Sequence, residues 1–279
     1  MSTPVPRLAF IDLDGTLYRW SLYIDLIEQL MRFQRTLPAS FFESQTHRRT
    51  WEERLSNEDT YLSQVIHEWE AKVVRGLSES ELRLAVHEVL RQPKTRAYVF
   101  ARELVGVLKE CGYQLIALGG SPLPMVQELA KEWKFDQTFG TEYILDTLRV
   151  YTRDQTKAKT MEAQKSTIVQ QALKQGSLHD GSVALGDTLS DWSVLKQVEY
   201  PIAFNPEQML HTKARQTGTP VIWERKNVVM AYRTDPEAFE TRGDAFLFRE
   251  VPLKDLLPAD VAELLTKRLR ALEQVPPAG

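Results

Sequence analysis

The sequence contains little cysteine, little net charge and no long apolar run. Among its 279 residues there is one cysteine, Cys111, which excludes a disulfide framework and predicts a reducing, cytoplasmic compartment. The formal net charge of −3 gives no reason to expect a nucleic-acid or membrane partner. No apolar run approaches the ~20 residues of a membrane span. Arg7 and Asp12 come too early for the apolar region of a signal peptide, and the histidines show no metal-ligand spacing.

The most informative segment is a short apolar run that ends in two aspartates. Asp12 and Asp14 follow Leu8-Ala9-Phe10-Ile11, and Gly15 and Thr16 come next. An apolar run bounded by a glycine turn is typical of a buried strand in an α/β sheet. Such sheets place their chemistry at the carboxyl ends of the strands. Taken alone, the pattern also fits a strand that ends in a solvated acidic turn.

Two further apolar runs, residues 182–185 and 114–118, also end in small or acidic residues. The first is followed by Gly186-Asp187 and the second by Gly119-Gly120-Ser121-Pro122. Side by side in one sheet, the three strands would gather four carboxylates at one edge. These carboxylates are Asp12, Asp14, Asp187 and Asp191. Oxygen ligands of this kind suit a hard divalent cation such as Mg²⁺, and without a cation or a lysine they would repel one another.

These motifs, in this order, resemble those of the haloacid dehalogenase (HAD) superfamily of phosphohydrolases, in its phosphoserine-phosphatase-like branch. Asp12-Leu13-Asp14-Gly15-Thr16 matches the first motif, and Gly186-Asp187-Thr188-Leu189-Ser190-Asp191 is similar to the fourth. Lys165, at the start of the amphipathic stretch 166–174, fits the third motif. Asn205-Pro206, after the apolar run 200–204, resembles the loop that follows motif four. Each motif is short, but together and in order they form a specific signal.

The resemblance implies a Rossmann-like three-layer α/β core with a mainly parallel sheet, plus an inserted all-helical cap of type I. The composition, 43% hydrophobic and 26% charged, is ordinary for a globular chain of this kind. We assign residues 1–17 and 96–225 to the core. Residues 18–95 keep a helical, charged pattern, with a capped helix start at residues 78–82, and are assigned to the cap. Residues 226–279 match no family feature, and we expect this C-terminal extension to pack on the core.

The resemblance also implies a role for each motif residue. The first aspartate, here Asp12, would attack phosphorus and form an aspartyl-phosphate. Asp14 would act as general acid and base, and Lys165 would balance the charge around Asp12. Asp12, Asp187 and the backbone carbonyl of Asp14 would bind Mg²⁺, while Asp191 would orient Lys165 or a metal-bound water. The residues expected to contact the substrate phosphate are Thr16, Gly119, Gly120 and Ser121.

The second motif departs from the family pattern. Family members place a serine or threonine hydroxyl at the end of this strand, where the chain has Gly119. Ser121 and the backbone N–H groups of a Gly119-Gly120 turn are the local alternatives for holding a phosphate oxygen. Phosphoserine phosphatases also place a substrate-binding glutamate shortly after motif one. The corresponding place here is near Ser21, where no acid stands.

The sequence therefore predicts a Mg²⁺-dependent phosphatase that hydrolyses a small phosphorylated metabolite through an aspartyl-phosphate. Two alternatives stay open. One is a phosphotransferase that uses the same intermediate, and the other is a regulatory or binding protein on a catalytically weakened HAD scaffold. Gly119 and the unmatched tail favour the second alternative, whereas the complete set of aspartates and Lys165 opposes it. Neither the physiological substrate nor the oligomeric state follows from the sequence.

Overall fold

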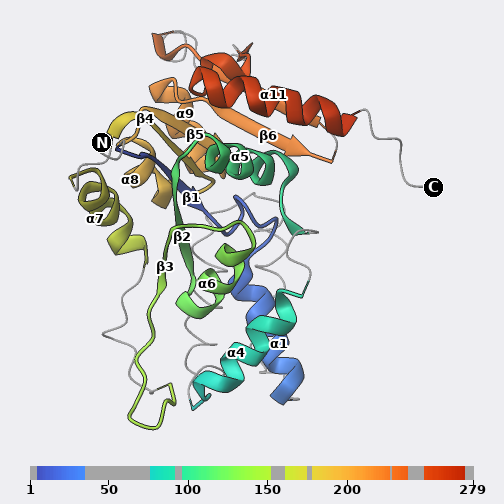
Figure 1. The fold of residues 1–279 in the computed structure, drawn as a ribbon, viewed down its shortest axis with the longest axis vertical. Coiled ribbons are helices and arrows are strands. Elements are labelled where there is room, and N and C mark those ends of the chain that lie inside the picture. Colours follow the sequence, from blue (N-terminus) through green and yellow to red (C-terminus); the bar gives the residue numbers. More distant parts are fainter. Residues whose placement is uncertain are drawn as a thin grey trace.

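The fold is an eight-stranded sheet with helices on both faces and a smaller helical part beyond one edge (Figure 1). The computed structural model describes residues 5–34, 76–91, 96–151, 161–174, 178–226, 228–237 and 248–273. Together with the family resemblance, this arrangement confirms the predicted three-layer α/β core. The described residues include no helix that is long and apolar enough to cross a membrane.

The strand order is β3-β2-β1-β4-β5-β6-β7-β8. All pairings from β3 to β6 are parallel, and β7 and β8 are added antiparallel at one side. The strands are β1 (Arg7–Asp12), β2 (Gln114–Pro122), β3 (Gln137–Thr141), β4 (Leu178–Gly186), β5 (Tyr200–Phe204), β6 (Val221–Arg225), β7 (Val228–Thr234) and β8 (Phe248–Glu250). Since β1, β2 and β4 run in the same direction, their carboxyl ends meet at one edge, as predicted.

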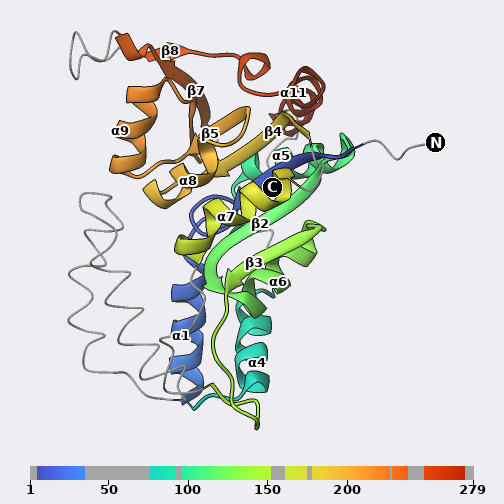
Figure 2. The ribbon, with the colours of Figure 1, turned by 90° about the vertical axis from the view of Figure 1, so that its left-hand side faces the viewer.

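Helices cover the sheet on both sides, which explains the apolar character of β1. Leu8 and Phe10 belong to a hydrophobic cluster with Met161 of α7 (Met161–Lys174). Ala9 and Ile11 point the other way, into a cluster shared with α5 (Val99–Glu110). Figure 2 shows α7, α8 (Trp192–Leu195) and α9 (Gln208–Thr217) on one face, with α5 and α11 (Ala259–Glu273) on the other. A strand buried on both faces reads as a continuous apolar run.

Two described helices, α1 (Leu22–Gln34) and α4 (Glu79–Val89), pack together beyond the carboxyl edge of the sheet (Figure 1). The chain enters and leaves this part along adjacent segments, because Tyr18 pairs antiparallel with Ala97. The predicted helix start is confirmed, since Ser78 and Glu81 form a capping box at α4. Residues 35–75, the middle of the predicted cap, lie outside the described residues. The cap's helical content there and the domain boundaries stay predictions.

The segment that follows β3 makes a connection that the sequence does not reveal. Residues 142–151 run to the start of α4, where Val150 forms an antiparallel bridge with Ser78. Arg149 also donates to the carboxylate of Glu79, at 2.7 Å. Residues assigned to the core are thereby joined to residues assigned to the cap.

The described part of the C-terminal extension continues the core sheet. β7 pairs with β6 and β8 pairs with β7, both antiparallel. Helix α11 packs in the same hydrophobic cluster as α5, through Val261 and Leu265. At the start of α11, Asp260 forms an ion pair with Arg7 of β1 at 2.6 Å.

One local prediction is wrong. The expected turn at Gly119-Gly120 is strand, because β2 continues to Pro122, with an irregular register against β3 after Leu118. The amphipathic stretch 166–174 forms part of α7, which the structure describes from Met161. Residues 161–164, Met-Glu-Ala-Gln, are good helix formers, and Lys165 lies within this helix.

Candidate active site

Asp12, the last residue of β1, is joined to Asp191 by Lys165. The buried ammonium of Lys165 donates to Oδ1 of Asp12 at 2.8 Å and to Oδ1 of Asp191 at 2.6 Å. Burial alone would lower the pKa of Lys165, but the two carboxylates outweigh it and raise that pKa above its usual value. Lys165 therefore stays charged and fixes the orientation of the Asp12 carboxylate.

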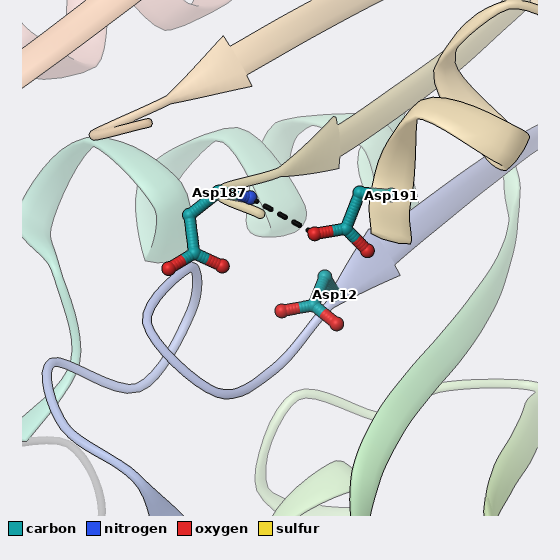
Figure 3. Close-up of side chains that lie close together, drawn as sticks. All are labelled: Asp12, Asp187 and Asp191. Carbon is teal, nitrogen blue, oxygen red and sulfur yellow. Dashed lines mark hydrogen bonds between the residues drawn. The ribbon is translucent and has the colours of Figure 1, made fainter. Parts of the chain in front are cut away.

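Asp191 is held by the loop in which it lies. Its Oδ2 accepts the N–H groups of Asp187 and Thr188, at 3.1 and 3.0 Å, and the Thr188 hydroxyl at 3.0 Å. Figure 3 shows the bond from the Asp187 N–H. This capping box opens the short 3-10 turn η3 (Leu189–Asp191). With both oxygens occupied by donors, Asp191 is suited to hold Lys165 and the loop in place.

Asp187 follows β4 and lies opposite Asp12 (Figure 3). The hydroxyl of Thr16, which is fully buried, donates to Asp187 Oδ1 at 3.1 Å. We expected Thr16 to contact the substrate phosphate, but in this structure its hydroxyl donates to Asp187. Gly15 packs so closely that an added Cβ would overlap the Asp187 carboxylate. The first motif therefore supports the fourth directly, across 171 residues of sequence.

The carboxylates form a group that fits a divalent cation. Oxygens of Asp12, Asp187 and Asp191 lie within 4.8 Å of one another (Figure 3). Burial raises the pKa of Asp12, and Asp191 adds to this, whereas Lys165 opposes it. The three buried carboxylates outnumber the one ammonium that binds Asp12 and Asp191, and this excess of negative charge suits hard cations that take oxygen ligands. Donors already surround the carboxylate of Asp191. The side chains of Asp12 and Asp187 are therefore better placed to bind a cation.

Asp14 lies between the sheet and the first helix beyond it. Its Oδ1 accepts the backbone N–H of Leu22, the first residue of α1, at 2.6 Å. The hydroxyl of Ser121 donates to the same carboxylate, 3.1 Å from Oδ1 and 3.0 Å from Oδ2. Burial raises the pKa of Asp14, and these hydrogen bonds counteract part of that rise. The side chain is thus held by two different elements, β2 and α1.

The motif-two residues lie in β2, next to β1. A Cβ added to Gly119 would come within 2.7 Å of Cγ2 of Val126, so the family's hydroxyl cannot be added without displacing that side chain. Gly120 is exposed, and a Cβ there would meet no atom within 4 Å. Of the predicted phosphate contacts, Gly120 is therefore the one with open space around it.

The sequence did not identify Glu207, a supporting acid in the loop after β5. The backbone N–H of Glu207 donates to the carbonyl of Asp187 at 2.8 Å. Its buried carboxylate accepts the N–H of Leu189 at 2.6 Å. Glu207 thereby fixes the loop that carries Asp187 and Asp191. Its place in Asn205-Pro206-Glu207, directly after an apolar run, was the available signal.

A second missed acid, Glu224 of β6, supports the segments that connect the helical part. Its buried carboxylate accepts the N–H groups of Val99 and Phe100, at 2.9 and 2.7 Å, at the start of α5. Arg19 donates to it at 3.1 Å. No sequence signal identified this role, because Glu224 stands between Trp223 and Arg225 like an ordinary residue at a strand end.

The chain belongs to the haloacid dehalogenase-like hydrolase family, which it matches over residues 9–196. The match runs from within β1 past the end of β4 and includes the motif residues from Asp12 to Asp191.

Two of the proteins to which this chain is similar are phosphoserine phosphatases. A phosphoserine phosphatase from Archaeoglobus fulgidus is 32% identical over 112 residues, 39% of this chain and 32% of that protein. The match thus spans only about a third of the length of this curated relative. A phosphoserine phosphatase solved as a phospho-aspartyl intermediate analogue has a TM-score of 0.53 at 20% identity, over 85% of this chain and 98% of that one.

A second solved structure is more similar in shape. A Bordetella pertussis protein, described as of unknown function, has a TM-score of 0.60 at 18% identity, over 78% of this chain and 98% of its own. At these identities the two structures show a common fold.

Proposed function

We propose that this chain is a Mg²⁺-dependent phosphatase that hydrolyses a small phosphomonoester through an aspartyl-phosphate on Asp12. The arrangement of Asp12, Lys165 and Asp191 carries the proposal. It presents a carboxylate at the end of a strand, holds it by a charged donor and surrounds it with the other carboxylates of the site. The relatives that are phosphoserine phosphatases support the same class of reaction.

The proposed reaction has two steps, and the same residues act in both. In the first, the Asp12 carboxylate attacks phosphorus, the bond from phosphorus to the leaving oxygen breaks, and Asp14 gives that oxygen its proton. In the second, Asp14 takes a proton from water, whose oxygen attacks phosphorus; the bond from phosphorus to the Asp12 oxygen breaks, which releases inorganic phosphate and restores the Asp12 carboxylate. Lys165 offsets charge on Asp12 and the phosphoryl group throughout. Asp12 and Asp187 would hold Mg²⁺, which supplies further positive charge when bound.

The described part of the site favours a substrate other than phosphoserine. Asp25 is the first acid after Ser21, one turn into α1, and it is already paired. Tyr18 donates its hydroxyl to Asp25 at 2.5 Å, and Arg96 forms an ion pair with the same carboxylate. A carboxylate held in this way is a poor ligand for a substrate ammonium. The substrate class we propose is therefore a small phosphomonoester whose alcohol part does not depend on a free acid near Ser21.

The test is an Asp12→Asn substitution with a panel of phosphomonoesters. We expect it to abolish both phosphate release and the trapping of an aspartyl-phosphate mimic with fluoroberyllate, because the amide is a very weak nucleophile. Asp260→Asn removes one carboxylate far from the site, and its activity should match that of the unchanged protein. Phosphate release by Asp12→Asn would contradict the mechanism. Transfer to an added alcohol in excess of hydrolysis would reassign the chain as a phosphotransferase.

A further inference from the structure

The hydroxyl of Ser121 carries an inference that deepens the proposed function and rests on it. We propose that Ser121 is a positioning residue for the acid Asp14 and does not bind the substrate phosphate. Ser121 lies in β2 with only 1% of its surface exposed. Its oxygen is 3.1 and 3.0 Å from the two carboxylate oxygens of Asp14.

The first argument concerns the single proton of the hydroxyl. A serine has one O–H donor, so a proton directed to Asp14 cannot also be donated to a phosphate oxygen. Turning it toward the phosphate would leave the Asp14 carboxylate without one of its donors in a buried place, which is costly. The hydroxyl is therefore committed to the acid.

The second argument concerns the elements that hold Asp14. Ser121 binds it from β2 in the rigid sheet, whereas the N–H of Leu22 binds it from α1. Without the Ser121 hydroxyl, α1 would be the only one of these two elements left to orient the carboxylate. Misplacing a reacting group by about 1 Å can cost on the order of 100-fold in rate. Ser121 thus fixes the acid relative to Asp12, which ends the neighbouring strand.

This role predicts a dependence on the leaving group. The leaving group of an alkyl phosphate is an alkoxide, a poor leaving group that must be protonated by an acid. The leaving group of nitrophenyl phosphate, nitrophenolate, departs with little help from an acid. Loss of a positioning residue for Asp14 should therefore slow alkyl substrates far more than aryl ones. Loss of a phosphate ligand would slow both classes alike and weaken inhibition by inorganic phosphate.

The experiment compares kcat/KM of Ser121→Ala on glycerol phosphate and on nitrophenyl phosphate, with inhibition by inorganic phosphate measured in parallel. The ratio kcat/KM reports formation of the aspartyl-phosphate, so the later hydrolysis step does not enter. We expect a loss of about 10- to 100-fold on glycerol phosphate, a loss within about 3-fold on nitrophenyl phosphate and unchanged inhibition. In an Asp14→Asn background, adding Ser121→Ala should have no further effect.

A control and a second variant separate this role from a structural one. Ser182 of β4 is also fully buried, and its hydroxyl accepts the N–H of Glu199 at 3.1 Å. Ser182→Ala should leave the ratio of alkyl to aryl rates unchanged. If Ser121→Ala does not fold, Ser121→Cys keeps the side chain's size with a much weaker donor and should show the same selective loss.

The possible outcomes bear on different claims. Equal losses on both substrates, or no loss on glycerol phosphate, would overturn the inference for Ser121. Weaker inhibition by inorganic phosphate in Ser121→Ala would show that the Ser121 hydroxyl binds the phosphate after all. An unchanged protein that is inactive on both substrates would overturn the proposed function itself, and the inference with it.

Discussion

At the residue scale, Gly15 shows how closely the first motif approaches the fourth. Its φ of +75° lies in the left-handed region, and a Cβ there would overlap the carboxylate of Asp187. Two effects therefore act against any side chain at this position: backbone strain of about 1–2 kcal/mol and displacement of Asp187. The second effect is the one that concerns the chemistry.

Gly15→Ala should lower phosphatase activity by about 100-fold or more and raise the Mg²⁺ concentration needed for half-maximal activity, because Asp187 must move. Gly112 is a matched control, since its φ is +77° and no atom lies within 4 Å of an added Cβ. Gly112→Ala carries the same backbone strain without the overlap. If the two variants kept equal activity and equal Mg²⁺ dependence, the approach of Gly15 to Asp187 would have no functional weight.

The sequence identifies the carboxylates of the site but not the partners of its hydroxyls. Asp12 and Asp187 each follow an apolar run, so a parallel sheet alone brings them to one edge. The hydroxyls of Thr16 and Ser121 were both expected at the phosphate, yet here they donate to Asp187 and Asp14. Which acceptor a hydroxyl chooses depends on a rotation about one bond and on residues more than 100 positions away, and no local pattern encodes that.

At the element scale, Glu224 connects three pieces of the fold. It stands in β6, satisfies two N–H groups at the start of α5 and receives Arg19 from the segment that enters the helical part. The first N–H groups of a helix have no partner within the helix, so a buried helix start needs an acceptor from elsewhere. A carboxylate with two acceptor oxygens serves both of them and the guanidinium together.

Glu224→Gln should destabilise the protein by about 2 kcal/mol. The amide NH₂ group of glutamine cannot accept a hydrogen bond, so it would face an N–H donor that is left without an acceptor. For a chain of this size the melting temperature should fall by roughly 4–8 °C. Glu263→Gln is the control: 71% of that side chain is exposed, and its ion pair joins only Lys267 of the same helix. Its melting temperature should change by less than about 1 °C. Equal shifts in the two variants would mean that Glu224 contributes no more than a surface acid.

Among the elements, the strands that read as apolar runs could be predicted, whereas the edge strand β3 could not. The strands β1, β2, β4 and β5 are flanked by other strands and read as apolar runs. β3 reads Gln-Thr-Phe-Gly-Thr and was not recognised as a strand, because it lies at the edge of the sheet and its first three residues are only half-buried. Its position is set by pairing with β2 and not by its own composition.

At the scale of the whole molecule, the order of motifs was enough to predict the class of fold, and the long-range contacts were not. The pairing of residues 149–151 with residues 76–79 joins segments about 70 positions apart, as the Arg149–Glu79 bond shows. Neither segment contains a motif that would reveal the other. Such contacts follow from how the finished elements dock, which a single sequence does not display.

The acidic site also affects the stability of the whole molecule. Asp12, Asp187 and Asp191 lie close together, and the ammonium of Lys165 binds Asp12 and Asp191, so without a cation the repulsion among the three carboxylates opposes folding. A bound cation should reverse this: at 100 times its Kd, a ligand that binds only the folded state stabilises it by about 2.7 kcal/mol. In this respect the acidic site would cost stability that the proposed Mg²⁺ would restore.

Asp187→Asn should therefore have opposite effects with and without Mg²⁺. In chelator, its melting temperature should exceed that of the unchanged protein by roughly 2–4 °C, because one repelling charge is gone while the amide oxygen can still accept the Thr16 hydroxyl. In saturating Mg²⁺ the order should invert, since the variant loses a ligand of the ion. Thermal unfolding across a Mg²⁺ titration measures both effects, and Glu263→Gln should run parallel to the unchanged protein. A Mg²⁺ response that is absent from the unchanged protein, or equal in Asp187→Asn, would contradict a metal site at these carboxylates.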